Sequence, residues 1–160
     1  MIDSSKTYEA PRSGLRQQAA VQRTDLRKEI YNKLKNVDPL SNHDILNKCK
    51  YSKLFNGVYF RDTLPKERIN GVGIMNLDSV KNDGTHWVLF YIDNDNNCYY
   101  FDSYGLPASL ELEKYFGKEY IYSSFVFQKN GNYCGHLCLK VLFYLDRYYN
   151  FIDAILNLIY

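Results

Sequence analysis

Three residues in the second half of the chain are of the types that a thiol-based hydrolase requires. Cys134 is followed directly by Gly135, Gln128 stands six residues before the cysteine, and His86 opens an apolar run about forty residues upstream of Gln128. A thiolate attacks carbonyl carbon, an imidazole takes the thiol proton, and a side-chain amide donates to the oxyanion that forms. The pattern predicts nucleophilic catalysis on a carbonyl compound.

A carboxylate that could orient the imidazole comes from the β-hairpin that His86 is expected to begin. The apolar run predicts a strand buried on both faces, and the turn-forming residues 93–97 separate it from a second strand. A hairpin folded about Asn94 places His86 opposite Asp102, within reach of an imidazole–carboxylate hydrogen bond; a register shifted by two residues is the alternative. Asp102 would fix the imidazole tautomer and favour the imidazolium.

Cys134 is expected at the beginning of a helix. Residues 130–132 form a tight loop of Asn, Gly and Asn, and a strongly apolar helical pattern runs from Cys134 onward. The dipole and the unpaired N–H groups of a helix N-terminus stabilise a thiolate and lower the thiol pKa. Gly135 would let the helix begin without a side chain that crowds the nucleophile.

Hydrophobic periodicity and turn residues predict the other elements. Ser41 is expected as the N-cap of a short helix, Gly117 as the stop of another, and the glycines at 71 and 73 indicate a bend or close packing on a strand. The predicted helices cover residues 14–36, 41–50, 108–116 and 152–159, and the extended segments lie within 56–62, 71–77, 86–92, 98–101 and 120–127.

The length and charge predict one domain without a dominant charged surface. With 160 residues and 18.9 kDa, the chain fits a flexible tail over residues 1–13 and a single domain over 14–160. The net charge of +2 does not indicate nucleic acid, although five basic residues lie in the first thirty: Arg12, Arg16, Arg23, Arg27 and Lys28. A solvated helix face is the favoured interpretation, and a polyanion-binding arm is the alternative.

The four cysteines predict free thiols. They show no paired CxxC spacing, and no secretory signal precedes them, so we expect reduced cysteines in an intracellular protein that is not secreted. His136 lies between Cys134 and Cys138, but a metal site would need a second ligand pair, and none is expected. No apolar stretch has the length of a membrane span.

The site residues and their surroundings resemble the adenain-like cysteine proteases, the group typified by the adenovirus maturation protease and related in fold to the ubiquitin-like-protein proteases. The matching pieces are GTHW at 84–87, YYFDSYG at 99–105, Gln128, and the Cys134-Gly135 pair. Three further pieces look closest to proteases of Polinton (Maverick) elements, virophages and related DNA viruses: NHDI at 42–45, GVYFRD at 57–62 and GIMNL at 73–77. The resemblance covers roughly residues 40–145.

This resemblance implies an α+β, papain-like or adenain-like fold, with a central mixed sheet flanked by helices and the nucleophile at a helix N-terminus. It places catalytic roles on His86, Asp102, Gln128 and Cys134. It places substrate-binding roles on Trp87 and Gly135, and Trp87 would wall the site by packing near Cys134. Adenovirus enzymes carry glutamate where this chain has Asp102, whereas the ubiquitin-like-protein proteases mostly have aspartate, so the mechanism is unaffected.

The resemblance also implies a role and a partner. The expected activity is that of a cysteine endopeptidase that processes viral or transposon capsid and virion precursors at sites with small residues, often glycine. We expect a monomer without cofactor, metal or membrane association, whose protein substrate is a capsid precursor polypeptide. The basic N-terminal segment would tolerate weak DNA binding, but its residues do not match those of the adenovirus enzyme.

Three other functions are compatible with parts of the sequence. A deubiquitinase or deSUMOylase that cleaves after a diglycine C-terminus would use the same four residues and the same narrow cleft. A catalytically silent binding module could retain the fold, although the presence of all four site residues argues against it. A nucleic-acid-binding protein would use the basic beginning of the chain and show strongly salt-dependent affinity.

Overall fold

The computed structural model describes residues 28–29, 32–34, 36–82 and 84–159. Residues 28–29 and 32–34 are helical, as predicted within 14–36. The rest of that helix, the tail predicted at 1–13 and most of the basic N-terminal residues lie outside the described part of the chain. The described residues from Val37 onward belong to one compact unit.

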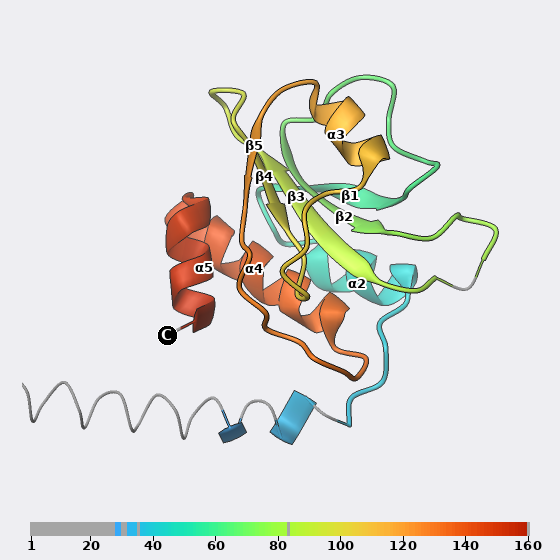
Figure 1. Cartoon of the computed structure of the whole chain (residues 1–160), viewed down its shortest axis with the longest axis vertical. Coiled ribbons are helices and arrows are strands. Elements are labelled where there is room, and N and C mark those ends of the chain that lie inside the picture. The colour runs from blue at the N-terminus through green and yellow to red at the C-terminus, as the bar shows by residue number, and fades with distance from the viewer. Residues whose placement is uncertain (1–27, 30–31, 35, 83, 160) are drawn as a thin grey trace, which may run out of the picture. The chain divides into compact units, whose positions relative to one another are not determined.

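Five strands form one mixed sheet in the order β1-β2-β3-β4-β5 (Figure 1). The strands are β1 (Phe55–Phe60), β2 (Gly71–Asn76), β3 (Trp87–Ile92), β4 (Cys98–Phe101) and β5 (Tyr120–Tyr122). The two outer pairs are parallel, and the two inner pairs are antiparallel. Every residue of β2 and β3 is buried, which confirms the strand buried on both faces that the apolar run predicted. The α+β class with a mixed sheet is therefore confirmed.

Between Val37 and Ile159, four described helices accompany the sheet, and their ends follow from local sequence. They are α2 (Asn42–Cys49), α3 (Leu110–Phe116), α4 (Cys134–Tyr148) and α5 (Phe151–Ile159). Ser41 is the N-cap of α2 as predicted, in a capping box that Asp44 completes. Gly117 ends α3 with φ of 64°, a left-handed conformation that glycine adopts without steric cost.

The sheet has a buried layer on each face. One face packs with α3 in a core cluster of Met75, Val88, Phe90, Ile92, Cys98, Tyr100, Ala108, Leu112 and Phe116. On the other face, α4 contacts β3 and α5 packs on α4, so that α3 and α4 lie on opposite sides of the sheet (Figure 1). Gly73 allows the Phe90 ring to lie directly on its backbone, which confirms the predicted close packing at this glycine.

The last strand is shorter than predicted. The aromatic and β-branched run predicted a strand over 120–127, but β5 ends at Tyr122. Beyond it the chain leaves the sheet, and the N–H groups of Phe127 and Gln128 both donate to the carbonyl of Ser103, at 2.9 and 3.0 Å. This segment is therefore held by the loop after β4 instead of by β4 itself, which brings Gln128 toward the ends of β3 and β4.

Candidate active site

Cys134 is the first residue of α4 and lines a cavity of about 570 Å³. Its side chain is 9% exposed, so the thiol is largely enclosed but still reached from the cavity. The first N–H groups of a helix have no partner within the helix, and they favour a negative charge beside them. The predicted placement at a helix N-terminus is confirmed.

His86 lies directly before β3 and is held on three sides. Its carbonyl accepts from the N–H of Leu77 at 2.9 Å, which ties it to the end of β2. Its Nε2 lies 2.7 Å from Asp102 Oδ1, and its ring stacks on Tyr104 with centroids 4.6 Å apart. With Nε2 engaged by the carboxylate, the other ring nitrogen is left for the thiol of Cys134, and the interaction of thiol and imidazole shifts the pKa of both groups.

Asp102 follows β4 and is 1% exposed. Its Oδ1 also accepts from the N–H of Tyr104 at 2.8 Å, so the carboxylate is fixed by the loop in which it stands. A buried carboxylate on Nε2 fixes the tautomer and stabilises the imidazolium.

The hairpin register differs from the predicted one. Tyr91 pairs with Tyr99 and Leu89 with Phe101, so the hairpin is centred on Asp95 instead of Asn94. The shift is the two-residue alternative that the sequence left open. His86 and Asp102 are consequently not directly opposite each other, and their side chains meet across the open end of the hairpin, beyond the last paired residues.

The thiol and the imidazole shift each other's ionisation. Burial lowers the pKa of His86, but its hydrogen bonds to Asp102 and Cys134 and their negative charges outweigh this and raise it to about 9. Burial raises the pKa of Cys134, but hydrogen bonds from His86 and from the Trp87 and Gly135 N–H groups, with the charge of His86, lower it overall. Both shifts favour a thiolate–imidazolium pair near neutral pH.

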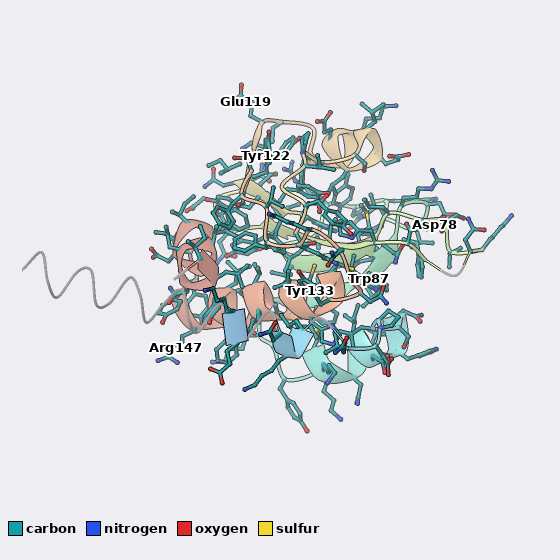
Figure 2. All side chains as sticks on the ribbon, turned by 60° about the horizontal axis from the view of Figure 1, so that its bottom comes forward. Asp78, Trp87, Glu119, Tyr122, Tyr133 and Arg147 are labelled. Atoms are coloured by element: carbon teal, nitrogen blue, oxygen red, sulfur yellow. The ribbon has the colours of Figure 1, made fainter. Side chains whose placement is uncertain are left out.

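Trp87 connects the strand that follows His86 to the helix that begins at Cys134. Its N–H donates to Cys134 Sγ at 3.4 Å, and its indole Nε1 donates to the carbonyl of Leu40 at 2.8 Å. Trp87 and Leu40 both line the cavity, as the predicted wall requires. Trp87 and Tyr133, the residue before Cys134, are labelled in Figure 2.

Gly135 serves the packing of this wall. A Cβ atom at Gly135 would lie 3.2 Å from Trp87 Cδ1 and 3.3 Å from two Leu40 atoms, which is tighter than ordinary contact. The glycine therefore lets α4 begin against Trp87 and Leu40. The direct role in substrate binding expected of Gly135 stays a prediction.

Gln128 is fully buried and joins the site through two hydrogen bonds. Its Oε1 accepts from Ser103 Oγ at 2.7 Å, and its Nε2 donates to the carbonyl of Gly131 at 2.8 Å. Gly131 lines the cavity together with Cys134. One amide hydrogen of Gln128 is thus engaged by the loop before α4. Gln128 is not among the residues that line the cavity of Cys134, so its role as oxyanion donor stays a prediction.

Three residues near the site were not singled out by sequence reasoning. Tyr104 stacks on the His86 ring, and Ser103 holds the Gln128 amide. Asn76 lines the cavity and accepts from the N–H groups of Asp78 and Thr85, at 2.9 and 3.1 Å, which fixes the loop that precedes His86. Ser103 and Tyr104 lie directly after Asp102 in the motif at 99–105, and Asn76 lies in the motif at 73–77, which were the signals in the sequence.

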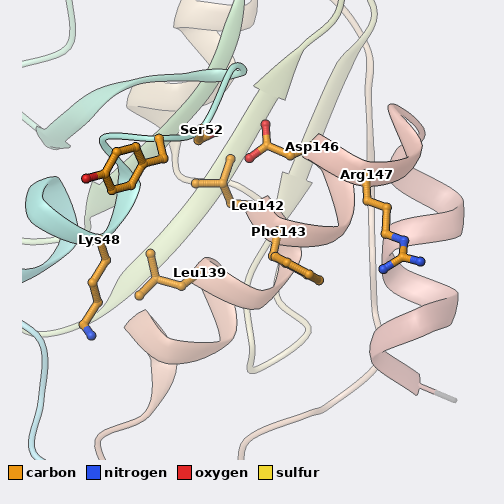
Figure 3. A pocket seen from close by; sticks show the side chains of 8 residues that line it. Lys48, Ser52, Leu139, Leu142, Phe143, Asp146 and Arg147 are labelled. Atoms are coloured by element: carbon orange, nitrogen blue, oxygen red, sulfur yellow. The ribbon is translucent and has the colours of Figure 1, made fainter.

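A second cavity, of about 650 Å³, lies between α2 and α4 (Figure 3). Its lining is Lys48, Tyr51, Ser52, Leu139, Leu142, Phe143, Asp146 and Arg147. Its lining includes neither cysteine nor histidine. Nucleophile, base and carboxylate meet only at the cavity of Cys134 among the described residues.

The other cysteines form neither disulfides nor a metal site. All four cysteines are free and buried. Within the described part of the chain, no three His, Cys, Asp or Glu side chains are grouped so that they could hold a metal ion. None of the described helices combines the length and apolar character needed to cross a bilayer.

Comparison with models of protein families and with curated proteins found no match to this chain.

Proposed function

We propose that this chain is a cysteine endopeptidase with an adenain-like fold. The observation that carries the proposal is the grouping of Cys134, His86 and Asp102: Cys134 and His86 line one cavity, and His86 Nε2 lies 2.7 Å from Asp102 Oδ1. The mixed sheet packed against a helix that begins with the nucleophile supports the adenain-like fold.

In the proposed reaction, the Cys134 thiolate attacks the peptide carbonyl carbon and forms a C–S bond, while the carbonyl oxygen becomes an oxyanion. The second amide hydrogen of Gln128 and the backbone N–H of Cys134 are the proposed donors that would stabilise that charge. His86 then gives its proton to the leaving amine, and the C–N bond breaks. Water, deprotonated by His86, attacks the thioester, and cleavage of the C–S bond restores the thiolate.

The proposed substrates are capsid or virion precursor polypeptides cleaved after small residues such as glycine. The resemblance of the motifs to the adenain-like proteases supports this class of substrate. The aromatic residues Phe60, Trp87 and Tyr104 line the cavity around Cys134. Such aromatic walls are what a narrow cleft for residues without bulky side chains would require.

The test is digestion of a peptide library, with products identified by mass spectrometry, for wild type, Cys134→Ala and the control Cys49→Ala. Cys49 is another buried free cysteine, on α2. We expect cleavage by wild type and Cys49→Ala, and a loss on the order of 10⁴-fold or more in Cys134→Ala. Equal processing by Cys134→Ala would exclude the proposal. Parallel digestion of a diglycine-linked ubiquitin-like conjugate tests the deubiquitinase alternative, which would cleave it in preference.

A further inference from the structure

Ser103 connects the two halves of the proposed site. It follows Asp102 directly in the chain and is fully buried. Its carbonyl accepts from the N–H groups of Phe127 and Gln128, and its hydroxyl donates to Gln128 Oε1 at 2.7 Å. Three hydrogen bonds therefore join the residue after the orienting carboxylate to the segment that carries the amide.

The partners of Gln128 define which way its amide is turned. The Gly131 carbonyl can only accept, so it requires Nε2 on its side, and Oε1 must then face Ser103 Oγ. Without the serine hydroxyl, Oε1 would be a fully buried acceptor with no donor in this position. A buried polar atom without a partner is costly, so the amide would rotate or withdraw.

We propose that Ser103 is a positioning residue that holds the Gln128 amide with its nitrogen toward the loop of Gly131 and Cys134. The inference rests on the proposed function for its kinetic consequence, because the amide nitrogen is the proposed oxyanion donor. The dipeptide Asp102-Ser103 then orients the base through its carboxylate and the oxyanion donor through its hydroxyl.

The kinetic test compares Ser103→Ala with the control Ser109→Ala on a peptide that wild type cleaves. Ser109 Oγ accepts from the Leu112 N–H at the start of α3, so the control also removes a bonded hydroxyl. We expect Ser103→Ala to lower kcat about 10-fold at unchanged KM, less than the 10²- to 10³-fold typical when an oxyanion donor is removed. Ser109→Ala should leave kcat unchanged.

A double-mutant comparison separates positioning from a structural role. In a Gln128→Ala background, Ser103→Ala should cause no further loss of kcat, because the amide on which it acts is gone. An equal loss in both backgrounds, or a loss confined to KM, would overturn the proposal. If Ser103→Ala does not fold, Ser103→Cys takes its place, since a thiol is a weaker donor in the same position; we expect a loss of kcat there too.

A measurement that needs no turnover tests the positioning itself. In the ¹⁵N NMR spectrum, the Gln128 Nε2 hydrogens should exchange slowly in wild type and at least about 10-fold faster in Ser103→Ala, because burial and hydrogen bonding protect them. Unchanged exchange would overturn the proposal. If wild type cleaves no peptide but exchange accelerates, the proposed function fails while the positioning by Ser103 stands.

Discussion

The first two turns of α4 each carry a cysteine, and the pKa values of the two thiols shift in opposite directions. Cys134 and Cys138 lie one helical turn apart, and both thiols contact the backbone of Trp87. The Trp87 N–H donates to Cys134 Sγ at 3.4 Å, whereas the Trp87 carbonyl accepts from Cys138 Sγ at 3.6 Å. One sulfur receives a hydrogen bond and the other gives one.

The two pKa values move apart for this reason. Burial raises the pKa of both thiols, but at Cys134 the donors His86, Trp87 N–H and Gly135 N–H reverse the effect. At Cys138 a backbone hydrogen bond lowers the pKa too little to offset full burial, and the negative charges of Cys134, Asp102 and Cys49 raise the pKa further. Burial acts in the same direction on both cysteines, so the hydrogen-bond donors around the sulfur determine which thiol has the lower pKa.

The largest expected effect of this difference is on alkylation of the native protein by iodoacetamide at pH 7. Cys134 should react faster than Cys138 by a factor on the order of 10³, since only Cys134 combines a lowered pKa with access from a cavity. Peptide mapping by mass spectrometry after timed quenching measures both rates. Comparable labelling of the two residues in the folded protein would contradict the expected difference in reactivity between Cys134 and Cys138.

The next largest effect is expected when His86, which lowers the pKa of Cys134, is removed. Removing His86 removes the hydrogen bond and charge that lower the pKa of Cys134, so alkylation of Cys134 at pH 6 should fall roughly 10- to 100-fold in His86→Ala. The pH at which alkylation is half-maximal should move upward, toward that of an ordinary thiol. His136→Ala is the matched control, because the pKa of His136 responds to burial, Lys48 and Asp44, with no contribution from Cys134.

Cys134 and His86 also determine how the proposed peptidase rate depends on pH. The raised pKa of His86 keeps the imidazolium protonated up to about pH 9, so the proposed peptidase rate should rise as Cys134 ionises and decline as pH passes through about 9. Stopped assays from pH 5 to 10 measure both limbs. A rate that keeps rising above pH 9 would contradict a protonated His86 as the acid that serves the leaving amine.

Much of the fold and the choice of site residues could be predicted because the signals were local. Ser41 and Gly117 mark helix ends through their own backbone and capping preferences, and the apolar run after His86 could only be a buried strand. The long apolar helical pattern that begins at Cys134 likewise predicted that this residue starts a helix. Chemically distinctive side chains at the ends of such elements can be recognised without coordinates.

The hairpin register could not be predicted, because it depends on the conformation of the turn. Asn96 adopts a left-handed conformation with φ of 64°, and the Asp93 carboxylate accepts from the N–H groups of Asp95 and Asn97. These contacts move the centre of the hairpin by one residue and each strand pairing by two. The sequence of turn-forming residues predicts the turn without fixing which residue lies at its centre.

The proposed role of Ser103 could not be predicted from the sequence for a different reason. Its hydroxyl meets Gln128 across 25 residues of sequence, only because β5 stops at Tyr122 and the following segment folds back on the loop after β4. A serine after an aspartate has many local explanations. Its function depends on where two loops meet, which sequence periodicity does not report.

The smallest expected effect tests whether Cys138 contributes stability without chemistry. Cys138→Ala removes a fully buried sulfur and its contact with the Trp87 carbonyl, so it should lower the free energy of unfolding by about 1–2 kcal/mol. Cys49→Ala, which removes a sulfur with 1% exposure on α2, should cost a similar amount. Urea denaturation followed by fluorescence measures both, and the alkylation rate of Cys134 should stay within about 2-fold of wild type in each, because neither sulfur donates to Cys134. If Cys138→Ala alone slowed that alkylation, the second turn of α4 would act on the nucleophile through Trp87, and the two cysteines could no longer be separated into one for chemistry and one for packing.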